Sequence, residues 1–263
     1  MSWPWLLITG ALLTSLTMFV MWRIQQRTRN AGTVDVAWSA GIGILVLYFA
    51  IFSSNGFLAR RAMVAAMTGS WSIRLALHLW KRIGREPEDG RYEKIRTEKG
   101  IEASRWFFWF YQFQAALVVL FAIPPLIAMR VPFESLNAFD AVALAIWLIS
   151  VIGEAIADRQ LAAFRANPDH RGKTCREGLW RYSRHPNYFF EWLHWFVYVA
   201  IAIAAPLGWL TLAGPLLMLF FLFQMTGIPP TEARALVSRG DDYRDYQKTT
   251  SVFFPWFPKE ASK

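Results

Sequence analysis

The chain has 263 residues, of which 55% are hydrophobic and 18% are charged. Soluble domains are about 45–50% apolar and about 25% charged, so this composition excludes an ordinary soluble enzyme and favours a membrane protein. The chain is also basic, with 28 Lys and Arg against 19 Asp and Glu. These charges lie between apolar runs, so no nucleic-acid partner is expected. The single cysteine, Cys175, excludes an internal disulfide, and the four histidines lack the spacing of metal ligands.

Apolar stretches of membrane-spanning length recur along the whole chain. A bilayer core requires about 20 apolar residues per helix. The stretches cover residues 3–22, 34–52, 62–80, 106–129, 138–157, 189–205 and 207–227. We therefore expect an all-α integral membrane protein of a single domain, with seven transmembrane helices.

The distribution of basic residues indicates the orientation of these spans. If the N-terminus lies outside, segments 23–33, 81–105, 158–188 and 228–263 lie inside and hold 24 of the 28 Lys and Arg. The positive-inside rule therefore predicts the N-terminus outside and the C-terminus inside. Because two of the inner segments are long and polar, we expect the functional site on the inner face.

Ionisable residues also occur inside the predicted spans, where they are costly and usually face the bundle interior. They are Asp35, Arg74, His78, Glu154, Asp158, Glu191 and His194. Arg74 and His78 lie one helical turn apart on one face, which Arg82 continues. The structural alternatives are solvated helix ends, internal ion pairs, a packing histidine and a snorkelling arginine.

The segment Gly178–Tyr188 carries arginines, two phenols, a histidine and an amide at the mouth of a predicted span. Arginine binds phosphate bidentately, and aromatic rings can stack on a nucleobase. Glu191 follows Asn187 by one helical turn, so both can face one pocket. The residues favour a nucleotide site, and the alternative is a basic helix that binds anionic lipid headgroups. Since no Rossmann fingerprint is present, the bundle and its inner loops would hold the nucleotide.

The segment Gly178–Glu191 and the tail from Glu232 to Pro255 resemble the membrane steroid 5α-reductase superfamily. The motif Val34–Trp38 and the loop Arg82–Tyr92 resemble, more narrowly, its bacterial DUF1295 branch. The resemblance covers almost the whole chain. Its Arg-His-Pro-x-Tyr core is also similar to isoprenylcysteine and phospholipid methyltransferases.

The resemblance implies a seven-helix bundle that holds NADPH on its cytosolic side. Residues 1–130 are then the substrate-pocket half and residues 138–263 the cofactor-binding half. Family motifs and the nearby basic and aromatic residues give the expected cofactor-binding set: Arg82, Arg91, Glu154, Asp158, Arg165, Lys173, Tyr182, Arg184, His185, Asn187, Tyr188, Glu191 and Glu232. Glu154 stands where the family has an amide, and Glu232 falls near a family histidine.

The expected catalytic residues are Asp35, His78 and Tyr92. Asp35 is the only carboxylate of the second span, and Leu79 stands at the family's tyrosine position, next to His78. Asp35 and His78, or Tyr92, are expected to polarise the substrate carbonyl and to supply a proton.

The expected function is the NADPH-dependent reduction of an activated C=C bond in a steroid- or isoprenoid-like substrate, by an oxidoreductase acting on CH–CH groups. The alternatives are an S-adenosylmethionine-dependent methyltransferase of a lipid or prenylated substrate, and a non-enzymatic lipid-binding protein. The expected partners are the bilayer and the lipophilic substrate. We expect a monomer in a bacterial inner membrane, with its cofactor site on the cytoplasmic side.

Overall fold

The computed structural model describes residues 1–84, 88, 90–225 and 227–259, and this part of the chain is helical, without a strand. It divides into two compact units. Unit 1 contains residues 1–137 and 204–211, and unit 2 contains residues 138–203 and 212–263.

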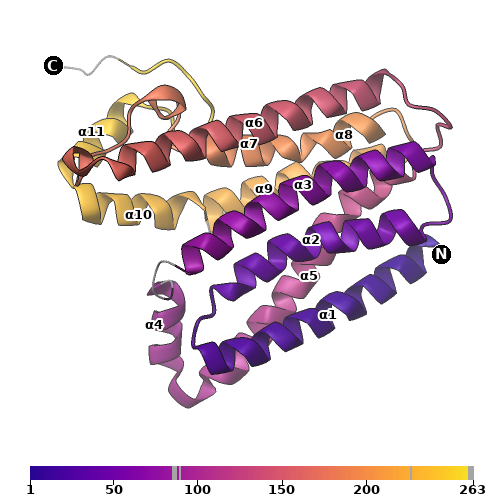
Figure 1. Cartoon of the computed structure of the whole chain (residues 1–263), viewed down its shortest axis with the longest axis horizontal. Helices are drawn as coiled ribbons and strands as arrows, with labels where there is room; N and C mark the ends of the chain where they lie inside the picture. Colours follow the sequence, from indigo (N-terminus) through magenta and orange to yellow (C-terminus); the bar gives the residue numbers. More distant parts are fainter. Residues whose placement is uncertain (85–87, 89, 226, 260–263) are drawn as a thin grey trace. The chain divides into compact units, whose positions relative to one another are not determined.

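Unit 1 is a helical bundle around α2 (Figure 1). Its helices are α1 (Trp3–Thr28), α2 (Thr33–Phe52), α3 (Leu58–Ile83), α4 (Gly90–Lys99), η1 (Gly100–Glu102) and α5 (Ala103–Met129). α2 packs against α1, α3 and α5. Helices α2 and α3 approach closely at Gly43, where a Cβ would clash with Ser72 and only glycine leaves enough space. Ser72 Oγ donates to the Ser39 carbonyl at 2.6 Å, which fixes this crossing.

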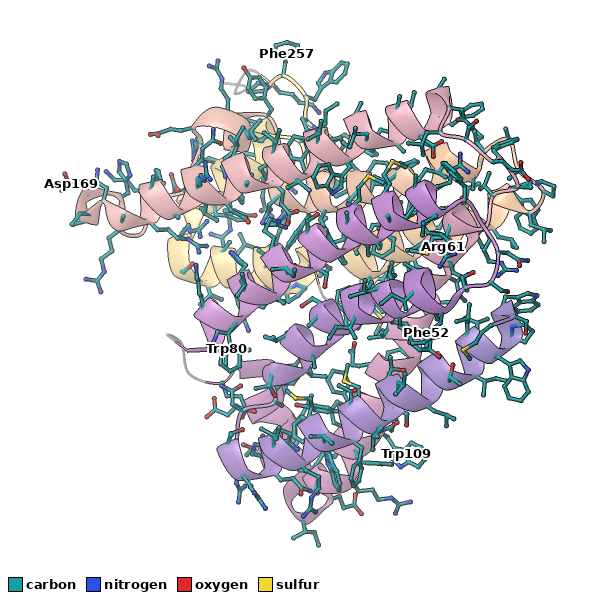
Figure 2. The ribbon with its side chains drawn as sticks, turned by 45° about the vertical axis from the view of Figure 1, so that its right-hand side comes forward. Phe52, Arg61, Trp80, Trp109, Asp169 and Phe257 are labelled. Carbon is teal, nitrogen blue, oxygen red and sulfur yellow. The ribbon has the colours of Figure 1, made fainter. Side chains whose placement is uncertain are left out.

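Three arginines that lie between predicted spans, outside the predicted inner segments, form hydrogen bonds to helix ends and loops in unit 1. Arg61, near the beginning of α3 (Figure 2), donates its Nε–H to the Ala50 carbonyl at 2.9 Å, near the end of α2. Arg60 is fully buried and donates to the Phe133 carbonyl at 2.6 Å. Arg130 donates to Ser53 Oγ at 3.2 Å. These charges therefore complement helix C-termini and loop carbonyls.

Unit 2 is built on the long helix α6 (Ala138–Ala166), which runs beside α7 (Pro186–His194) and α8 (Phe196–Ala202) (Figure 1). The remaining elements of unit 2 are η2 (Pro168–His170), η3 (Gly178–Arg181), α9 (Ala213–Gln224), α10 (Ile228–Arg239) and α11 (Asp241–Thr249). The short helix η4 (Gly208–Leu212), which precedes α9 in the chain, belongs to unit 1 except for Leu212. α10 packs on α9 and α11. The exposed ring of Phe257 projects from the tail that follows α11 (Figure 2).

All seven predicted apolar stretches are mainly helical. Five helical stretches are long and apolar enough to cross a membrane: Trp3–Thr28, Thr33–Phe52, Tyr92–Met129, Ala138–Ala166 and Gly208–Arg239. α3 has the same length of 26 residues as α1, but Arg74 and His78 reduce its apolar character. α7 and α8 are short helices separated at Trp195. The all-α prediction is confirmed, and the apolar helices agree with a membrane-embedded protein. The count of seven spans and their orientation remain predictions.

Candidate functional site

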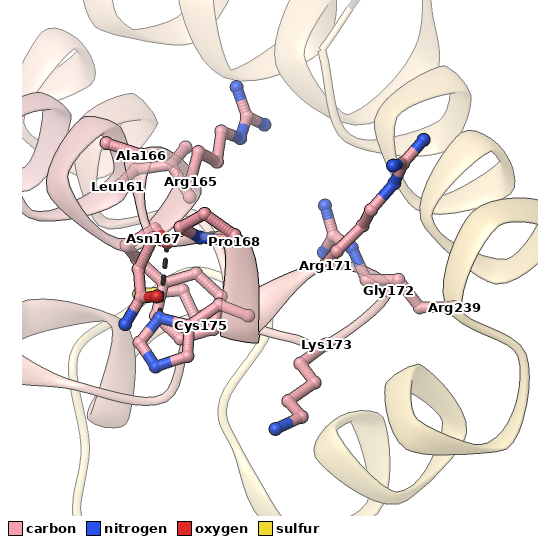
Figure 3. Close-up of a pocket in the computed structure, with 12 residues that line it drawn as sticks. Leu161, Arg165, Ala166, Asn167, Pro168, Arg171, Gly172, Lys173, Cys175 and Arg239 are labelled. Atoms are coloured by element: carbon pink, nitrogen blue, oxygen red, sulfur yellow. Dashed lines mark hydrogen bonds between the residues drawn. The ribbon is translucent and has the colours of Figure 1, made fainter.

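A cleft of about 460 Å³ lies in unit 2 where α6 ends (Figure 3). Four basic residues line it: Arg165, Arg171, Lys173 and Arg239. Within the part of the chain that the structure describes, no carboxylate lines this cleft. Because its lining residues carry four basic groups and no acidic one, the cleft is suited to an anion with several charges.

The loop that carries this charge is fixed by its own residues. The Asn167 side chain accepts a hydrogen bond from the Asp169 backbone N–H at 3.0 Å. The His170 ring stacks on Phe164 with centroids 4.1 Å apart, and the Lys173 N–H donates to the His170 carbonyl at 3.0 Å. Arg171 and Lys173 therefore project from an ordered turn, which lowers the entropic cost of binding an anion.

Cys175 lines the same cleft and is buried. Burial raises the pKa of its thiol. The thiol therefore stays protonated near neutral pH and is a poor nucleophile. Cys175 thus contributes an uncharged surface to the cleft.

The face of α6 that borders the cleft also carries the predicted acidic pair. Glu154, Asp158, Leu161 and Arg165 are spaced by four, three and four residues, which places them along one side of the helix. Leu161 and Arg165 line the cleft. Asn187 Nδ2 donates to Asp158 Oδ1 at 3.3 Å, so two predicted cofactor residues meet on this face. Glu154 is buried, and Glu191 is half-buried one turn after Asn187.

Glu232 is the centre of a hydrogen-bond cluster at the beginning of α7. Its Oε1 accepts from Arg184 Nε at 2.7 Å, His185 Nε2 at 3.2 Å and Tyr243 OH at 3.3 Å. Its Oε2 accepts from Gln247 Nε2 at 2.8 Å. A carboxylate has about four lone-pair sites, so these donors use the capacity of Glu232. This arrangement favours a role in holding Arg184 and His185, and a direct cofactor contact remains a prediction.

His185 is uncharged near neutral pH in this cluster. Burial lowers its pKa, and the hydrogen bond with Glu232 opposes that effect. Its ring lies nearly parallel to that of Tyr188, with centroids 5.4 Å apart. The Tyr188 hydroxyl lies 3.2 Å from Thr231 Oγ1 on α10. The Arg-His-Pro-x-Tyr core therefore joins α7 to α10.

The C-terminal tail fixes the residues that precede α7. The Tyr182 carbonyl accepts from the Trp256 backbone N–H at 2.9 Å, and the Tyr182 ring packs edge-on against Phe257. Ser183 Oγ donates to the Phe253 carbonyl at 2.8 Å. Sequence analysis did not predict these contacts between the tail and the loop.

Gly178 allows the same segment to turn against α6. Its φ is +57°, and a Cβ there would clash with the Gln160 side chain. Gln160 Oε1 accepts the Leu179 N–H at 2.8 Å. A residue with a side chain at position 178 would therefore displace the group that holds the loop.

In unit 1, two of the three predicted catalytic residues are in contact. Tyr92 of α4 donates its hydroxyl hydrogen to Asp35 Oδ1 at 3.3 Å. The Tyr92 ring is buried against Phe107 and Phe110 of α5. His78 has an exposed side chain on α3. The predicted cofactor residues Arg82 and Arg91 have side chains outside the described residues, so their roles remain predictions.

Sequence reasoning did not single out Glu88 and Arg96, which flank Tyr92 four residues on either side. Arg96 NH2 donates to Glu88 Oε1 at 2.9 Å. Glu88 Oε1 also accepts the Ala31 N–H at 2.7 Å, in the turn between α1 and α2. Arg96 lies one helical turn after Tyr92 on α4, whereas Glu88 precedes this helix, so helical spacing did not signal the pair. Among the described residues, no group of three or more His, Cys, Asp or Glu is placed to hold a metal ion.

Two comparisons with known proteins find matches to this chain. A family model described as "Protein of unknown function (DUF1295)" matches residues 21–250. An uncharacterized protein of the fission yeast Schizosaccharomyces pombe is 28% identical over 277 residues, which cover 94% of this chain and 79% of the yeast protein. No solved structure matches the chain.

Proposed function

The chain belongs to the DUF1295 family, and we propose that it is an NADPH-dependent membrane oxidoreductase that reduces an activated C=C bond in a lipophilic substrate. The observation that carries this proposal is the basic cleft of unit 2 with its four cations and no lining carboxylate in the described chain. The sequence resemblance to steroid 5α-reductases supports the same reaction class.

The cleft fits the phosphate end of NADPH better than it fits S-adenosylmethionine. NADPH carries three phosphates, whereas S-adenosylmethionine carries a sulfonium cation and no phosphate. The volume of about 460 Å³ is within the range of about 300–1,000 Å³ for ligand sites. Arg165, Arg171 and Arg239 can bind phosphate oxygens in a bidentate manner, and Lys173 adds a compact charge.

Three further polar groups lie on α6, which borders the cleft, and on the neighbouring α7. Asn187 and Asp158 offer an amide and a carboxylate that can bind the carboxamide of a nicotinamide ring, and Glu191 lies one turn further along α7. When bound, NADPH supplies the hydride that adds to the β-carbon of an enone or enoyl group. The protein then has to orient this ring and exclude water.

The proton is assigned to the Tyr92–Asp35 pair of unit 1. The Tyr92 hydroxyl can turn from Asp35 to a substrate carbonyl oxygen, polarise it and transfer its proton to the enolate oxygen. Tautomerisation in water then places a proton on the α-carbon, and solvent restores the phenol. Asp35 fixes the position of the hydroxyl before the substrate binds.

The proposal is tested by equilibrium binding of NADPH to the purified protein in lipid nanodiscs. Arg171→Glu places an acid in the cleft, and Arg244→Glu makes the same charge change on the exposed face of α11. Since a hydrogen bond to a charged group contributes about 1.5–3 kcal/mol, Arg171→Glu should raise the Kd by about tenfold or more. Arg244→Glu should leave the Kd within about twofold because surface charges are screened. Equal losses in both variants would contradict a phosphate site in the cleft.

A further inference from the structure

Glu88 and Arg96 form a connection between α4 and the turn that precedes α2. Arg96 directs two nitrogens at the Glu88 carboxylate, with NH2 at 2.9 Å from Oε1 and Nε at 3.4 Å from Oε2. Both side chains are largely buried, with exposed fractions of 21% and 13%. A two-point contact of this kind fixes direction as well as distance.

The pair is attached to the α1–α2 turn at Ala31 and to the last part of α1 at Gln25. Glu88 Oε1 accepts the N–H of Ala31, a fully buried residue of that turn, at 2.7 Å. Arg96 NH2 also donates to the side chain of Gln25, near the end of α1, at 3.3 Å. The Tyr111 hydroxyl of α5 donates to the Ala31 carbonyl at 3.2 Å. The turn is therefore held from both α4 and α5.

The same turn starts the helix that carries Asp35. The Asp35 N–H donates to the Gly32 carbonyl at 3.1 Å, in the first turn of α2. Tyr92 lies midway in sequence between Glu88 and Arg96, and its hydroxyl bond to Asp35 is long at 3.3 Å. Because this hydrogen bond is long, its length should respond to small changes in the position of α4 relative to α2.

A second contact of Arg96 places it against the Tyr92 environment. The Arg96 guanidinium carbon lies 4.9 Å from the centre of the Phe107 ring, which also packs edge-on against Tyr92. Arg96 therefore supports the aromatic wall beside Tyr92 while it binds Glu88.

We propose that Glu88 and Arg96 are positioning residues that set the distance between the Tyr92 hydroxyl and Asp35. This proposal rests on the proposed function, because it takes Tyr92 as the proton donor. Neither residue reaches a reacting atom itself. Their effect on the reaction passes through the placement of α4.

The experiment replaces Tyr92 with 3-fluorotyrosine and records its ¹⁹F resonance in the full-length protein in nanodiscs, without cofactor or substrate. Asp35→Asn defines the resonance position when the partner of Tyr92 changes. We expect Glu88→Ala to move the resonance in the same direction as Asp35→Asn, and Glu88→Gln to leave it near the wild-type position. Glutamine keeps an acceptor for Ala31 and Arg96. Arg96→Lys is a milder change of the same ion pair and should shift the resonance less than Glu88→Ala. It provides the test if Glu88→Ala does not fold.

Lys94→Ala is the matched control on the same helix. It removes an ion pair with Glu98 at 3.7 Å whose partners are mostly exposed. This variant should leave the Tyr92 resonance unchanged. An unchanged resonance in both Glu88→Ala and Arg96→Lys, or an equal shift in Lys94→Ala, would overturn the positioning role.

Kinetics separate this proposal from the proposed function. In an active protein, Glu88→Ala should lower kcat at least tenfold without changing the KM for NADPH, and Glu88→Gln should restore most of kcat. Absence of NADPH oxidation in the wild-type protein, with the expected resonance shifts, would overturn the proposed function alone. Normal kcat in Glu88→Ala despite a shifted resonance would overturn the link between placement and reaction.

Discussion

Arg184 donates its Nε–H to Glu232 Oε1 at 2.7 Å, and both side chains are largely buried. The same guanidinium donates from NH1 to the carbonyls of Gln247 at 2.9 Å and Thr250 at 3.1 Å, near the end of α11. Arg184 therefore joins the beginning of α7 to α10 and α11. In the proposed function, phosphate binding is therefore assigned to the cations of the cleft and not to Arg184.

Glu232→Ala should destabilise the protein strongly. The change leaves Arg184 without its carboxylate and removes an acceptor from His185. Breaking a buried ion pair by removing one partner costs about 3–5 kcal/mol. Glu232→Gln keeps an acceptor and should cost less. Denaturant unfolding in detergent, compared with Asp245→Ala at an exposed ion pair of α11, measures the difference.

His185 should make stability depend on pH. Burial lowers its folded pKa below the ordinary value of 6.5, so the unfolded state binds a proton more readily. The stabilisation is therefore complete above about pH 6.5 and is lost as the pH falls through the folded pKa. Thermal unfolding between pH 7.5 and pH 5.5 should show this loss. His185→Gln should flatten the profile over that window, and an identical profile would contradict the assignment.

Tyr92→Phe should impair the reaction and spare cofactor binding. Proton transfer by a positioned side chain contributes about 10²–10⁴-fold to the rate, so kcat should fall within this range. Asp35→Asn should give a smaller loss, because it changes the partner of the phenol and keeps the phenol itself. Steady-state kinetics with NADPH provides the measurement. A lower affinity for NADPH with unchanged kcat would place Tyr92 in the binding site instead.

Arg239→Gln should reduce the preference for NADPH over NADH. Arg239 lines the cleft from the end of α10, and NADH lacks the additional phosphate that the cleft can bind. The NADPH affinity of the wild-type protein should also fall with added salt, and less steeply in the variant. Parallel titrations with both nucleotides at two salt concentrations measure this effect. An unchanged preference for NADPH over NADH in the variant would show that Arg239 does not bind the additional phosphate.

The sequence predicted the helical class because apolar stretches of bilayer length leave few alternatives. The resemblance placed Asn187 and Asp158 in the same expected cofactor-binding set, but their contact between α7 and α6 was not predicted. Sequence analysis named Tyr92 as an alternative to Asp35 and His78 and did not predict its contact with Asp35. The contact itself depends on the packing of α4, which a ten-residue polar helix does not reveal from its sequence.

The cluster around Glu232 could not be predicted in the same way. Its partners come from positions 184, 185, 243 and 247, and the pairing depends on how α7, α10 and α11 pack. Arg184 was expected to be available for phosphate because residue type alone does not show a buried partner. The cleft could not be predicted either, because it forms only when the loop 166–175 is folded and α10 brings Arg239 next to the other cations.

Thermal stabilisation of the wild-type protein by nucleotides tests the central claim most directly. A ligand at 100 times its Kd that binds only the folded state adds about 2.7 kcal/mol of stability. NADPH should raise the unfolding temperature, NADH should raise it less at equal concentration, and S-adenosylmethionine should leave it unchanged. A rise with S-adenosylmethionine and none with NADPH would contradict the reductase account and favour a methyltransferase.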